Sequence, residues 1–385
     1  MKRSIHILAI LCGLATGSSL FAASTAIAVA PDSQQLPFGY ITNNGTITIT
    51  AYTGPEGEVI IPDTINGYPV ATFGDGTGAV FRSNNVTSVT IPGTVKTIAE
   101  SSFYHSTALT NVTLLSGVST IEDRAFSGCG GLISIELPAT LTNFGSFVFA
   151  DCWNLQGIDV DPNNPGYASS DGVLFDRAFT TLLAYPAGRS GSYTVPNGAV
   201  IIGVGAFENS PNLISLAIPD TVKSVGDQAF NQCEALTSVT IGRGVTNIGI
   251  AAFDLCYALR SIYFAGNAPA IANSALFGVP GTAYYLPGTA GWGPTLGDLP
   301  TSPWVLPYPV ILDRGLDRTQ ATGQYSFVVS WATNRLVIVE ACVDLSRPSS
   351  QALVTNALIT STSFFSVVDA VRTDASARFY RLKSP

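Results

Sequence analysis

Residues 213–235 read LISLAIPDTVKSVGDQAFNQCEA, and residues 236–258 repeat the pattern as LTSVTIGRGVTNIGIAAFDLCYA. Two further copies, at residues 109–131 and 132–154, keep the same spacing from the opening leucine to a phenylalanine and a cysteine. A short unit repeated at fixed spacing is typical of a solenoid, in which every unit forms one coil and stacks on its neighbours. The repeats therefore predict the architecture more directly than the function.

Each copy opens with a segment that alternates apolar and small polar residues. In residues 213–235 the apolar positions are Leu216 and Ile218, and a second apolar pair follows at Val222 and Val225. Strict alternation predicts a half-buried strand, which proline or glycine then ends. The second pair is expected to close the opposite wall of the coil.

A phenylalanine preceded by a small residue recurs near the end of the copies. The stretch around it is long enough for only one or two helical turns. We expect the rings to stack from coil to coil as a ladder in the core, made by Phe103, Phe126, Phe149, Phe207, Phe230 and Phe253.

The full pattern, L-x-S-V-x-I-P-x-x-V-x-x-I-x-x-x-A-F-x-x-C, resembles the BspA-type leucine-rich repeats of bacterial secreted and surface proteins, over residues 56–283. Irregular coils such as VIIPDTINGYPV (59–70) and the longer segment 159–186 also match that family. The resemblance implies a leucine-rich-repeat solenoid, a β-rich superhelix of about nine 23-residue coils with short helical turns. It also implies a non-enzymatic exported protein for adhesion or surface display, which binds protein or polysaccharide.

The amino terminus has the features of a secretory signal peptide. The chain begins with MKR, continues with an apolar run from Ile5 to Ala15, and carries an A-x-A site at Ala26–Ala28. This pattern predicts a signal peptide at residues 1–28 and a secreted or cell-surface protein. The alternative, a membrane anchor, is disfavoured because residues 16–19 interrupt the run before it could span a bilayer.

The mature chain divides into four predicted parts. Residues 29–58 alternate Thr and Ile and should form an N-terminal cap, because the end of a solenoid exposes its core. The leucine-rich-repeat solenoid follows at residues 59–283, and a Pro/Gly/Trp-rich cap and linker at 284–323. The period is lost in residues 324–385, which predict a C-terminal all-β module.

Trp292 and Trp304 lie in the predicted cap and linker. We expect their rings to seal the last coil. The alternative is an aromatic platform for sugars, since such rings combine an apolar face with a polar edge. A glycan-binding or glycan-active protein, with its site in the C-terminal module or near Trp292, is therefore the rival to the repeat-surface interpretation.

The charge balance limits the possible partners. The sequence has 18 basic and 26 acidic residues, a formal charge of -8, and two of the basic residues belong to the predicted signal peptide. An acidic surface repels phosphate backbones, so nucleic acid is not expected as a partner. No later stretch approaches the uninterrupted apolar length of a membrane span.

Residues for catalysis are scarce. His105 is the only histidine after the signal peptide, which argues against a histidine-based triad or a His-rich metal site. Asp159, Asp161 and Asp171 could supply carboxylates for sugar hydrolysis, but they lie in one coil and lack an opposing wall. The sequence predicts no enzyme and no cofactor.

A calcium site is the alternative for the same segment. Asp159, Asp161 and Asn163 have the spacing that opens an EF-hand loop, but Asn164 stands where glycine is needed and Ser170 where glutamate is needed. Side-chain to backbone hydrogen bonds in a turn are the favoured interpretation.

Four cysteines share one position of the repeat. Other copies have serine there, so the position requires a small side chain, and we favour a stack of buried thiols. Because the protein is expected to be exported, disulfides between neighbouring coils remain the alternative. The pairs are Cys129 with Cys152 and Cys233 with Cys256.

The outward strand positions are mostly small and polar. Exceptions are Glu136, Asp159 and Tyr263, which are the candidate residues of a binding surface. Tyrosine is enriched among residues that dominate binding energy. The expected partner is an extracellular or envelope protein or polysaccharide, bound along an extended surface.

Overall fold

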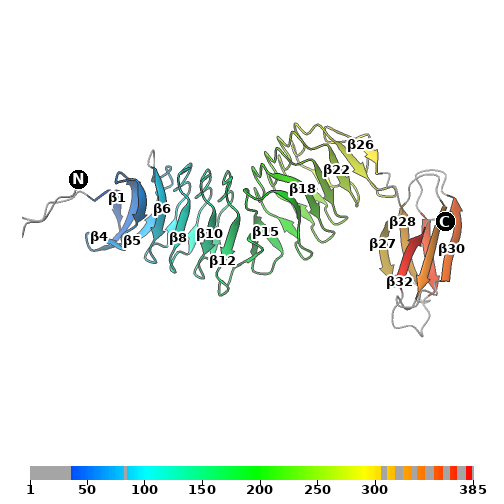
Figure 1. The fold of residues 1–385 in the computed structure, drawn as a ribbon, viewed down its shortest axis with the longest axis horizontal. Helices are drawn as coiled ribbons and strands as arrows, with labels where there is room; N and C mark the ends of the chain where they lie inside the picture. Colours follow the sequence, from blue (N-terminus) through cyan, green and yellow to red (C-terminus); the bar gives the residue numbers. More distant parts are fainter. Residues whose placement is uncertain are drawn as a thin grey trace, which may run out of the picture. The chain divides into compact units, whose positions relative to one another are not determined.

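The computed structural model describes residues 36–81 and 85–304 in full, and between residues 310 and 383 it describes the backbone of six strands. The chain forms a β-solenoid of about ten turns (Figure 1). Every regular element within these described residues is a strand. None of them therefore offers an apolar helix of membrane-spanning length.

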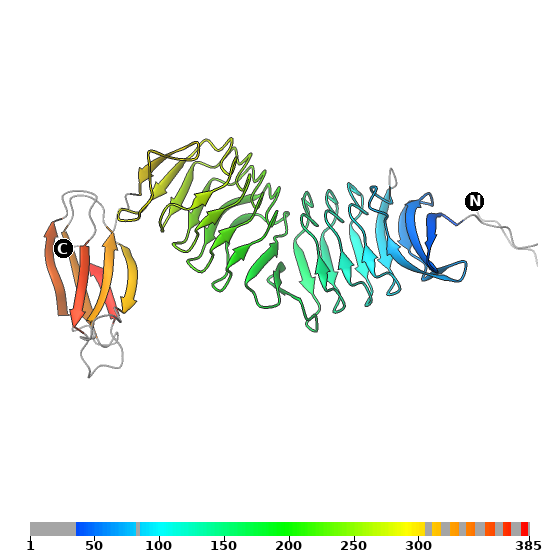
Figure 2. The ribbon, with the colours of Figure 1, turned by 180° about the vertical axis from the view of Figure 1, so that it is seen from behind.

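The longer strands of the coils form two parallel sheets, which divide the coils into two blocks (Figures 1 and 2). In the first block the order is β3 (Gly57–Ile60), β6 (Val86–Ile91), β8 (Asn111–Leu114), β10 (Ser134–Leu137) and β12 (Gly157–Val160). In the second it is β16 (Gly191–Thr194), β18 (Leu213–Ile218), β20 (Ser238–Ile241), β22 (Ser261–Phe264), β24 (Thr282–Tyr285) and β26 (Leu299–Pro303), with β25 (Thr295–Leu296) pairing antiparallel to β26. We call the outward surface of these two sheets the strand face.

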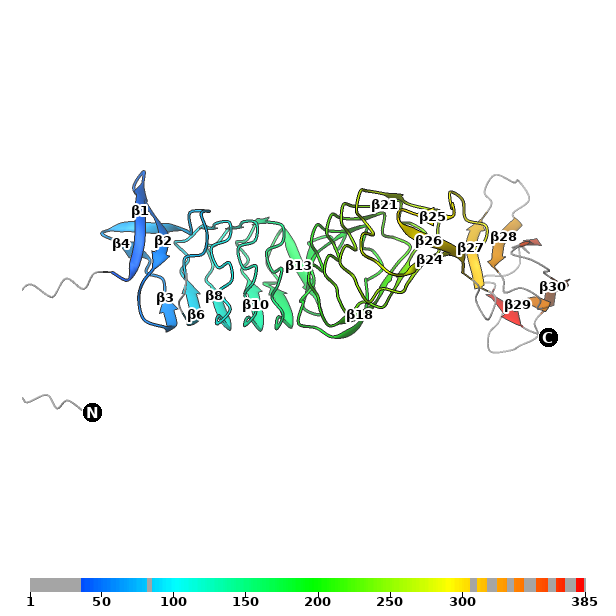
Figure 3. The same ribbon diagram turned by 90° about the horizontal axis from the view of Figure 1, so that it is seen from above.

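A second set of strands, many of them only two residues long, forms the opposite wall of the coils; Figure 3 views the coils from above and labels β13 and β21 of this wall. The wall of the first block contains β1 (Phe38–Asn43), β2 (Thr46–Tyr52), β5 (Tyr68–Phe73), β7 (Thr97–Ile98), β9 (Thr120–Ile121) and β11 (Asn143–Phe144), with β4 (Thr64–Ile65) on β5. The wall of the second contains β13 (Tyr167–Ser170), β14 (Val173–Asp176), β15 (Thr181–Ala184), β17 (Ile201–Ile202), β19 (Ser224–Val225), β21 (Asn247–Ile248) and β23 (Ala270–Ile271).

The predicted N-terminal cap region contains a β-hairpin. Strands β1 and β2 pair antiparallel around Asn44 and Gly45, which both have positive φ, and β2 pairs with β5 of the first coil. An Asn-Gly pair with two positive φ angles suits a two-residue hairpin turn. The Thr/Ile alternation places Ile47 and Ile49 fully in the core. The hairpin thus pairs with the edge of the first coil.

The expected helical turns are absent from the described coils, and the prediction was wrong for an identifiable reason. In the coil that contains Phe230, the backbone N–H groups of Gln228, Phe230 and Gln232 donate to carbonyls of the following coil, at 2.8 to 2.9 Å. Gln228 and Gln232 have φ angles of 53° and 59°. Left-handed residues four apart cannot continue a right-handed helix. Bonds between coils therefore replace bonds within a helix.

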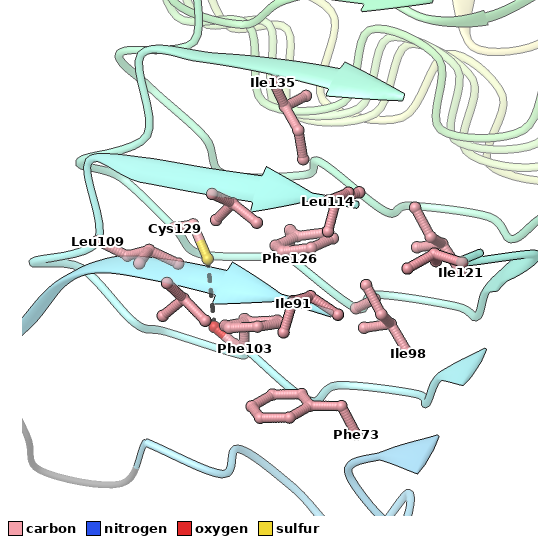
Figure 4. Close-up of a cluster of buried hydrophobic side chains, with 14 of the residues drawn as sticks. Phe73, Ile91, Ile98, Phe103, Leu109, Leu114, Ile121, Phe126, Cys129 and Ile135 are labelled. Carbon is pink, nitrogen blue, oxygen red and sulfur yellow. Dashed lines mark hydrogen bonds between the residues drawn. The ribbon is translucent and has the colours of Figure 1, made fainter. Parts of the chain in front are cut away.

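The phenylalanine ladder is confirmed, as two runs of stacked rings. Phe73, Phe103, Phe126 and Phe149 form the first, with ring centroids 4.7 to 5.7 Å apart. Figure 4 shows the first three of these rings. The second contains Tyr185, Phe207, Phe230 and Phe253, at 4.7 to 4.9 Å. Each run belongs to its own hydrophobic core. The sequence pattern missed Tyr185, because the insertion before it breaks the period.

The insertion at residues 159–186 lies where the two sheets stop. It contributes the hairpin β13–β14 and strand β15, which pairs with β17 of the next coil. Its residue Gly172 accepts a hydrogen bond from the backbone N–H of Ile158 in β12. The hairpin therefore supplies a backbone partner to the last strand of the first sheet, so that this strand is not a bare edge.

Six strands follow the coils. They form two antiparallel sheets, one of β27 (Val310–Leu316), β28 (Gln324–Ser330) and β31 (Phe365–Ala370), the other of β29 (Leu336–Cys342), β30 (Gln351–Leu358) and β32 (Phe379–Lys383). Strand β26 pairs with β24, so the strand face continues into the segment that the sequence assigned to the cap and linker. Strand β27 of the same segment pairs with β28.

We expect limited proteolysis of the mature protein to cut between Pro303, where β26 ends, and Val310, where β27 begins. Strand β26 pairs within the second block and β27 pairs with β28, and linkers between separately folded units are preferred sites of nicking. Mass spectrometry would locate the cut, and circular dichroism would show whether both fragments stay folded. Resistance to cleavage there, with both parts unfolding in one transition, would contradict separate folding units.

Candidate binding surface

The strand face of the second block carries two rows of aligned side chains. Parallel pairing places one residue of each coil beside its equivalent in the next, because a one-to-one register repeats along the sheet. The first row consists of Ser192, Ser215, Ser238, Ser261 and Thr282. The second consists of Thr194, Ala217, Thr240, Tyr263, Tyr284 and Ser302. Both rows are free of ionisable acids and bases, apart from the phenols.

Three aromatic rings gather where the second row ends, and we call Tyr263, Tyr284 and Trp304 the aromatic cluster. The rings of Tyr263 and Tyr284 stack at 5.2 Å, and Trp304 packs against Tyr263 at 4.9 Å. All three side chains are half-buried. Trp304 is anchored by its backbone N–H, which donates to the carbonyl of Tyr285 at 2.7 Å. The candidate residue Tyr263 is thus the centre of a larger surface.

Of the two tryptophans expected to seal the last coil, Trp292 does so and Trp304 does not. Trp292 packs against the core of the second block, with its ring parallel to Tyr285 at 5.0 Å and tilted against Phe264 at 5.0 Å. It seals the last coil, as the sequence suggested. Trp304 instead lies with Tyr263 on the strand face, so the expectation that it seals the core was wrong.

Glu136 and Asp159 lie on the strand face of the first block, on β10 and β12. They are direct neighbours in the sheet register and both are exposed. With Glu58 on β3, they make this half of the strand face acidic. Like charges placed side by side repel each other weakly in water. Tyr263 lies on β22 of the other sheet, so the structure does not bring Glu136 and Asp159 together with it. The role of these two acids in binding stays a prediction.

The segment that resembles a calcium loop shows the hydrogen bonds of a turn. Asp161 Oδ1 accepts from the backbone N–H of Asn163 at 2.8 Å and from its Nδ2 at 3.1 Å. The buried Asn164 donates to the carbonyls of Pro138 and Leu141, and its Oδ1 accepts from two backbone N–H groups. Clusters of three or more His, Cys, Asp or Glu side chains suited to a metal are absent from the described residues.

His105 is an exposed residue at a coil corner. Its φ is 56°, and its ring meets the neighbouring Tyr104 edge-on at 4.2 Å. Its backbone N–H donates to the carbonyl of Ser127 in the next coil. These contacts are those of a structural corner position.

The four repeat cysteines are free and fully buried, as expected for a stack of thiols. Each Sγ donates to the carbonyl of a ladder phenylalanine in the preceding coil, for example Cys129 to Phe103 at 3.2 Å (Figure 4) and Cys233 to Phe207 at 3.2 Å. Burial raises the pKa of Cys129 to about 12. The disulfide alternative is not formed, and the protonated thiols act as hydrogen-bond donors.

A polar cluster that the sequence did not reveal lies between the blocks, on a corner of the coils. Asn209 donates to Asp151 across the insertion, and the Arg124 guanidinium lies 4.9 Å above the ring of Phe147. Burial raises the pKa of Glu208 to about 7; the charge of Asp151 adds to this rise and Arg124 opposes it. Asn209 and Asp151 lie 58 residues apart in the sequence, so no local motif could have indicated the surroundings of Glu208.

An open hollow of about 450 Å³ on the opposite wall is lined by Glu100, Glu122, Asp123 and Tyr167 among others. Two of its three carboxylates accept hydrogen bonds from the backbone. Glu122 Oε2 accepts from the N–H of Glu100, and Asp123 Oδ1 accepts from the N–H of Ser146. Glu122 and Asp123 thereby join neighbouring coils.

Solved structures similar to this chain include bacterial leucine-rich-repeat proteins. A leucine-rich cell surface protein of Faecalibacterium prausnitzii is 24% identical, with 64% of this chain and 86% of that chain covered and a TM-score of 0.46. The pneumococcal vaccine antigen PcpA is 16% identical (66% and 86% covered, TM-score 0.47), and a leucine-rich-repeat protein of Eubacterium ventriosum is 21% identical (63% and 74%, 0.47).

A search of curated proteins finds no match. The model of the BspA type leucine-rich repeat region matches six copies, over residues 78–170 and 189–287, which together make up about half of the chain. These matched segments include most of the coils that build the two sheets and the phenylalanine ladder. The chain therefore belongs to the BspA-type leucine-rich-repeat family.

Proposed function

We propose that this chain is an exported, non-catalytic protein that binds an extracellular protein or polysaccharide through its strand face. The observation that carries the proposal is the aromatic cluster. Three large rings stand half-exposed on an otherwise small and polar surface, and Tyr and Trp are the residues that most often dominate binding energy. Extended concave or flat surfaces built from repeats are suited to such contacts.

The remaining ionisable groups support a binding role over a catalytic one. The carboxylates of Asp161, Glu122 and Asp123 accept hydrogen bonds from their own backbone or from neighbouring coils. The rival interpretation, a glycan-active site near Trp292, loses support because that ring is packed against the core. The C-terminal module as a glycan site stays an untested alternative.

The proposal of export depends on the sequence alone. The predicted signal peptide at residues 1–28 lies outside the described residues. Family membership supports a location outside the cytoplasm, because BspA-type repeats are those of bacterial secreted and surface proteins.

The proposal is tested by screening the mature protein against extracellular proteins and polysaccharides, with and without chelator and reductant. We expect binding that survives both reagents, because the described residues show neither a metal cluster nor a disulfide between the repeat cysteines. Tyr263→Ala should weaken binding, whereas Tyr257→Ala, which removes a 54% exposed ring at a coil corner, should not.

Two results would count against this proposal. Binding that is unchanged in Tyr263→Ala would move the site away from the strand face. Loss of binding in chelator alone would point to Asp159, Asp161 and Asn163 as calcium ligands.

A further inference from the structure

We propose that the strand face of the second block is a site for an uncharged polysaccharide, with the aromatic cluster as its anchor. This inference rests on the proposed function and specifies its ligand. The surface meant here consists of the aromatic cluster and the row of hydroxyls from Ser192 to Thr282.

The chemistry of the rings suits a sugar. One side of a pyranose ring presents C–H groups and its rim presents hydroxyls. Aromatic rings carry negative charge density on their faces, which attracts polarised C–H groups, while the phenol hydroxyls can exchange hydrogen bonds with the rim. Among the described residues, the Tyr263 and Tyr284 hydroxyls have no hydrogen-bond partner. Both remain available to a ligand.

The hydroxyl row adds a repeated feature. Ser192, Ser215, Ser238 and Ser261 follow one another with the spacing of neighbouring strands, about 4.8 Å. Ser215 Oγ donates to Ser192 Oγ at 2.7 Å, so within this pair one hydroxyl is a donor and the other an acceptor. A surface that repeats one hydroxyl per coil complements a polymer that repeats its hydroxyls, because several equivalent contacts add up along the chain.

The charge distribution argues for an uncharged ligand. The two rows of the second block are neutral, whereas the first block presents Glu58, Glu136 and Asp159. Two arginines of the second block are oriented by other groups: Arg260 donates to the carbonyl of Tyr257, and Arg243 pairs with Asp220 at 2.9 Å. A polyanion finds no cationic side chain within the two rows, and the acidic chain repels it. Protein partners usually match charges at the rim of an interface, which this surface lacks.

The test uses affinity electrophoresis of the mature protein in gels that contain one polysaccharide each. The neutral probes are a β-1,3-glucan, a mannan, hydroxyethyl cellulose and soluble starch, and the charged probe is polygalacturonate. We expect at least one neutral polymer to retard the protein and polygalacturonate not to retard it. The retardation should persist in 0.5 M salt, because salt screens attraction between charges and a neutral polymer carries none. Tyr284→Ala and Trp304→Ala should each weaken binding by about tenfold or more.

Tyr257→Ala and Trp153→Ala are the matched controls, because they remove rings that are 54% and 48% exposed away from the strand face. Circular dichroism of each variant checks that it folds, and Tyr284→Phe tests the phenol hydroxyl with the ring kept. Retention of full binding by Tyr284→Ala and Trp304→Ala would overturn the site.

A failure of this inference can be told apart from a failure of the proposed function. If no neutral polymer retards the protein, while a protein ligand binds and is lost in Tyr263→Ala, the polysaccharide assignment is wrong and strand-face binding stands. If a neutral polymer binds equally well to all variants, the sugar site lies elsewhere and both the assignment and the strand-face proposal are wrong.

Discussion

Replacing Phe230 by alanine should lower the free energy of unfolding by about 3 to 5 kcal/mol. The ring is fully buried and lies between Phe207 and Phe253, with centroids 4.9 Å from each. Alanine would leave a cavity in the middle of the second ladder. The rings on either side are held by the backbone bonds between coils, so they cannot move in to fill it.

Urea unfolding followed by circular dichroism would measure this loss. The matched control is Phe277→Ala, because Phe277 is 57% exposed and its loss should cost less than about 0.5 kcal/mol. A cost below about 1 kcal/mol for Phe230→Ala would mean that the ladder does not stabilise the second block.

Replacing Glu208 by glutamine should stabilise the protein at pH 8 by about 1 to 3 kcal/mol and have little effect at pH 4.5. Burial and the nearby Asp151 raise the pKa of Glu208 to about 7. The folded state thus holds the proton more tightly than the unfolded chain, whose carboxyl titrates near its ordinary value of 4.5. The stability from this residue is fully present below pH 4.5 and is lost as the pH rises to about 7.

The expected stabilisation is smaller than the free energy that corresponds to the whole pKa rise of Glu208, because the side chain is only half-buried and water screens its charge. Unfolding curves of both proteins at the two pH values give the difference. Glu234→Gln serves as the control, since Glu234 is exposed and its replacement should change stability by less than about 0.5 kcal/mol. Equal stabilisation of Glu208→Gln at both pH values would show that burial of the charge is not the cause.

The repeat period was sufficient to predict the coils and the ladder apart from Phe73 and Tyr185. Apolar residues at fixed positions from Leu213 onward must face one core if the coils stack, so Phe230 could be placed inside from sequence alone. The conformation of the corner near Gln228 could not be predicted from sequence. A short helical turn and a corner that is hydrogen-bonded to the next coil have the same short apolar pattern. Only the pairing of Gln228 with Ile250 decides between the two.

The candidate site was predicted in part. Tyr263 follows the period and was placed outward correctly, and the register confirms its position beside Tyr284. Tyr284 and Trp304 lie after the period ends, where no counting rule says which side chain points outward. The raised pKa of Glu208 could not be predicted either, because the residues that surround this side chain are distant in the sequence.

The hydrogen bonds between coils have a consequence for how the length of this protein can change. Thr237 Oγ1 donates to the carbonyl of Ile214, Thr246 Oγ1 to that of Lys223, and the N–H of Ile250 to Asp227, each pair 23 residues apart. Deleting or duplicating one complete copy leaves every remaining coil with equivalent partners. Evolution can therefore adjust the reach of the array in single steps of about 4.8 Å without redesigning its interior.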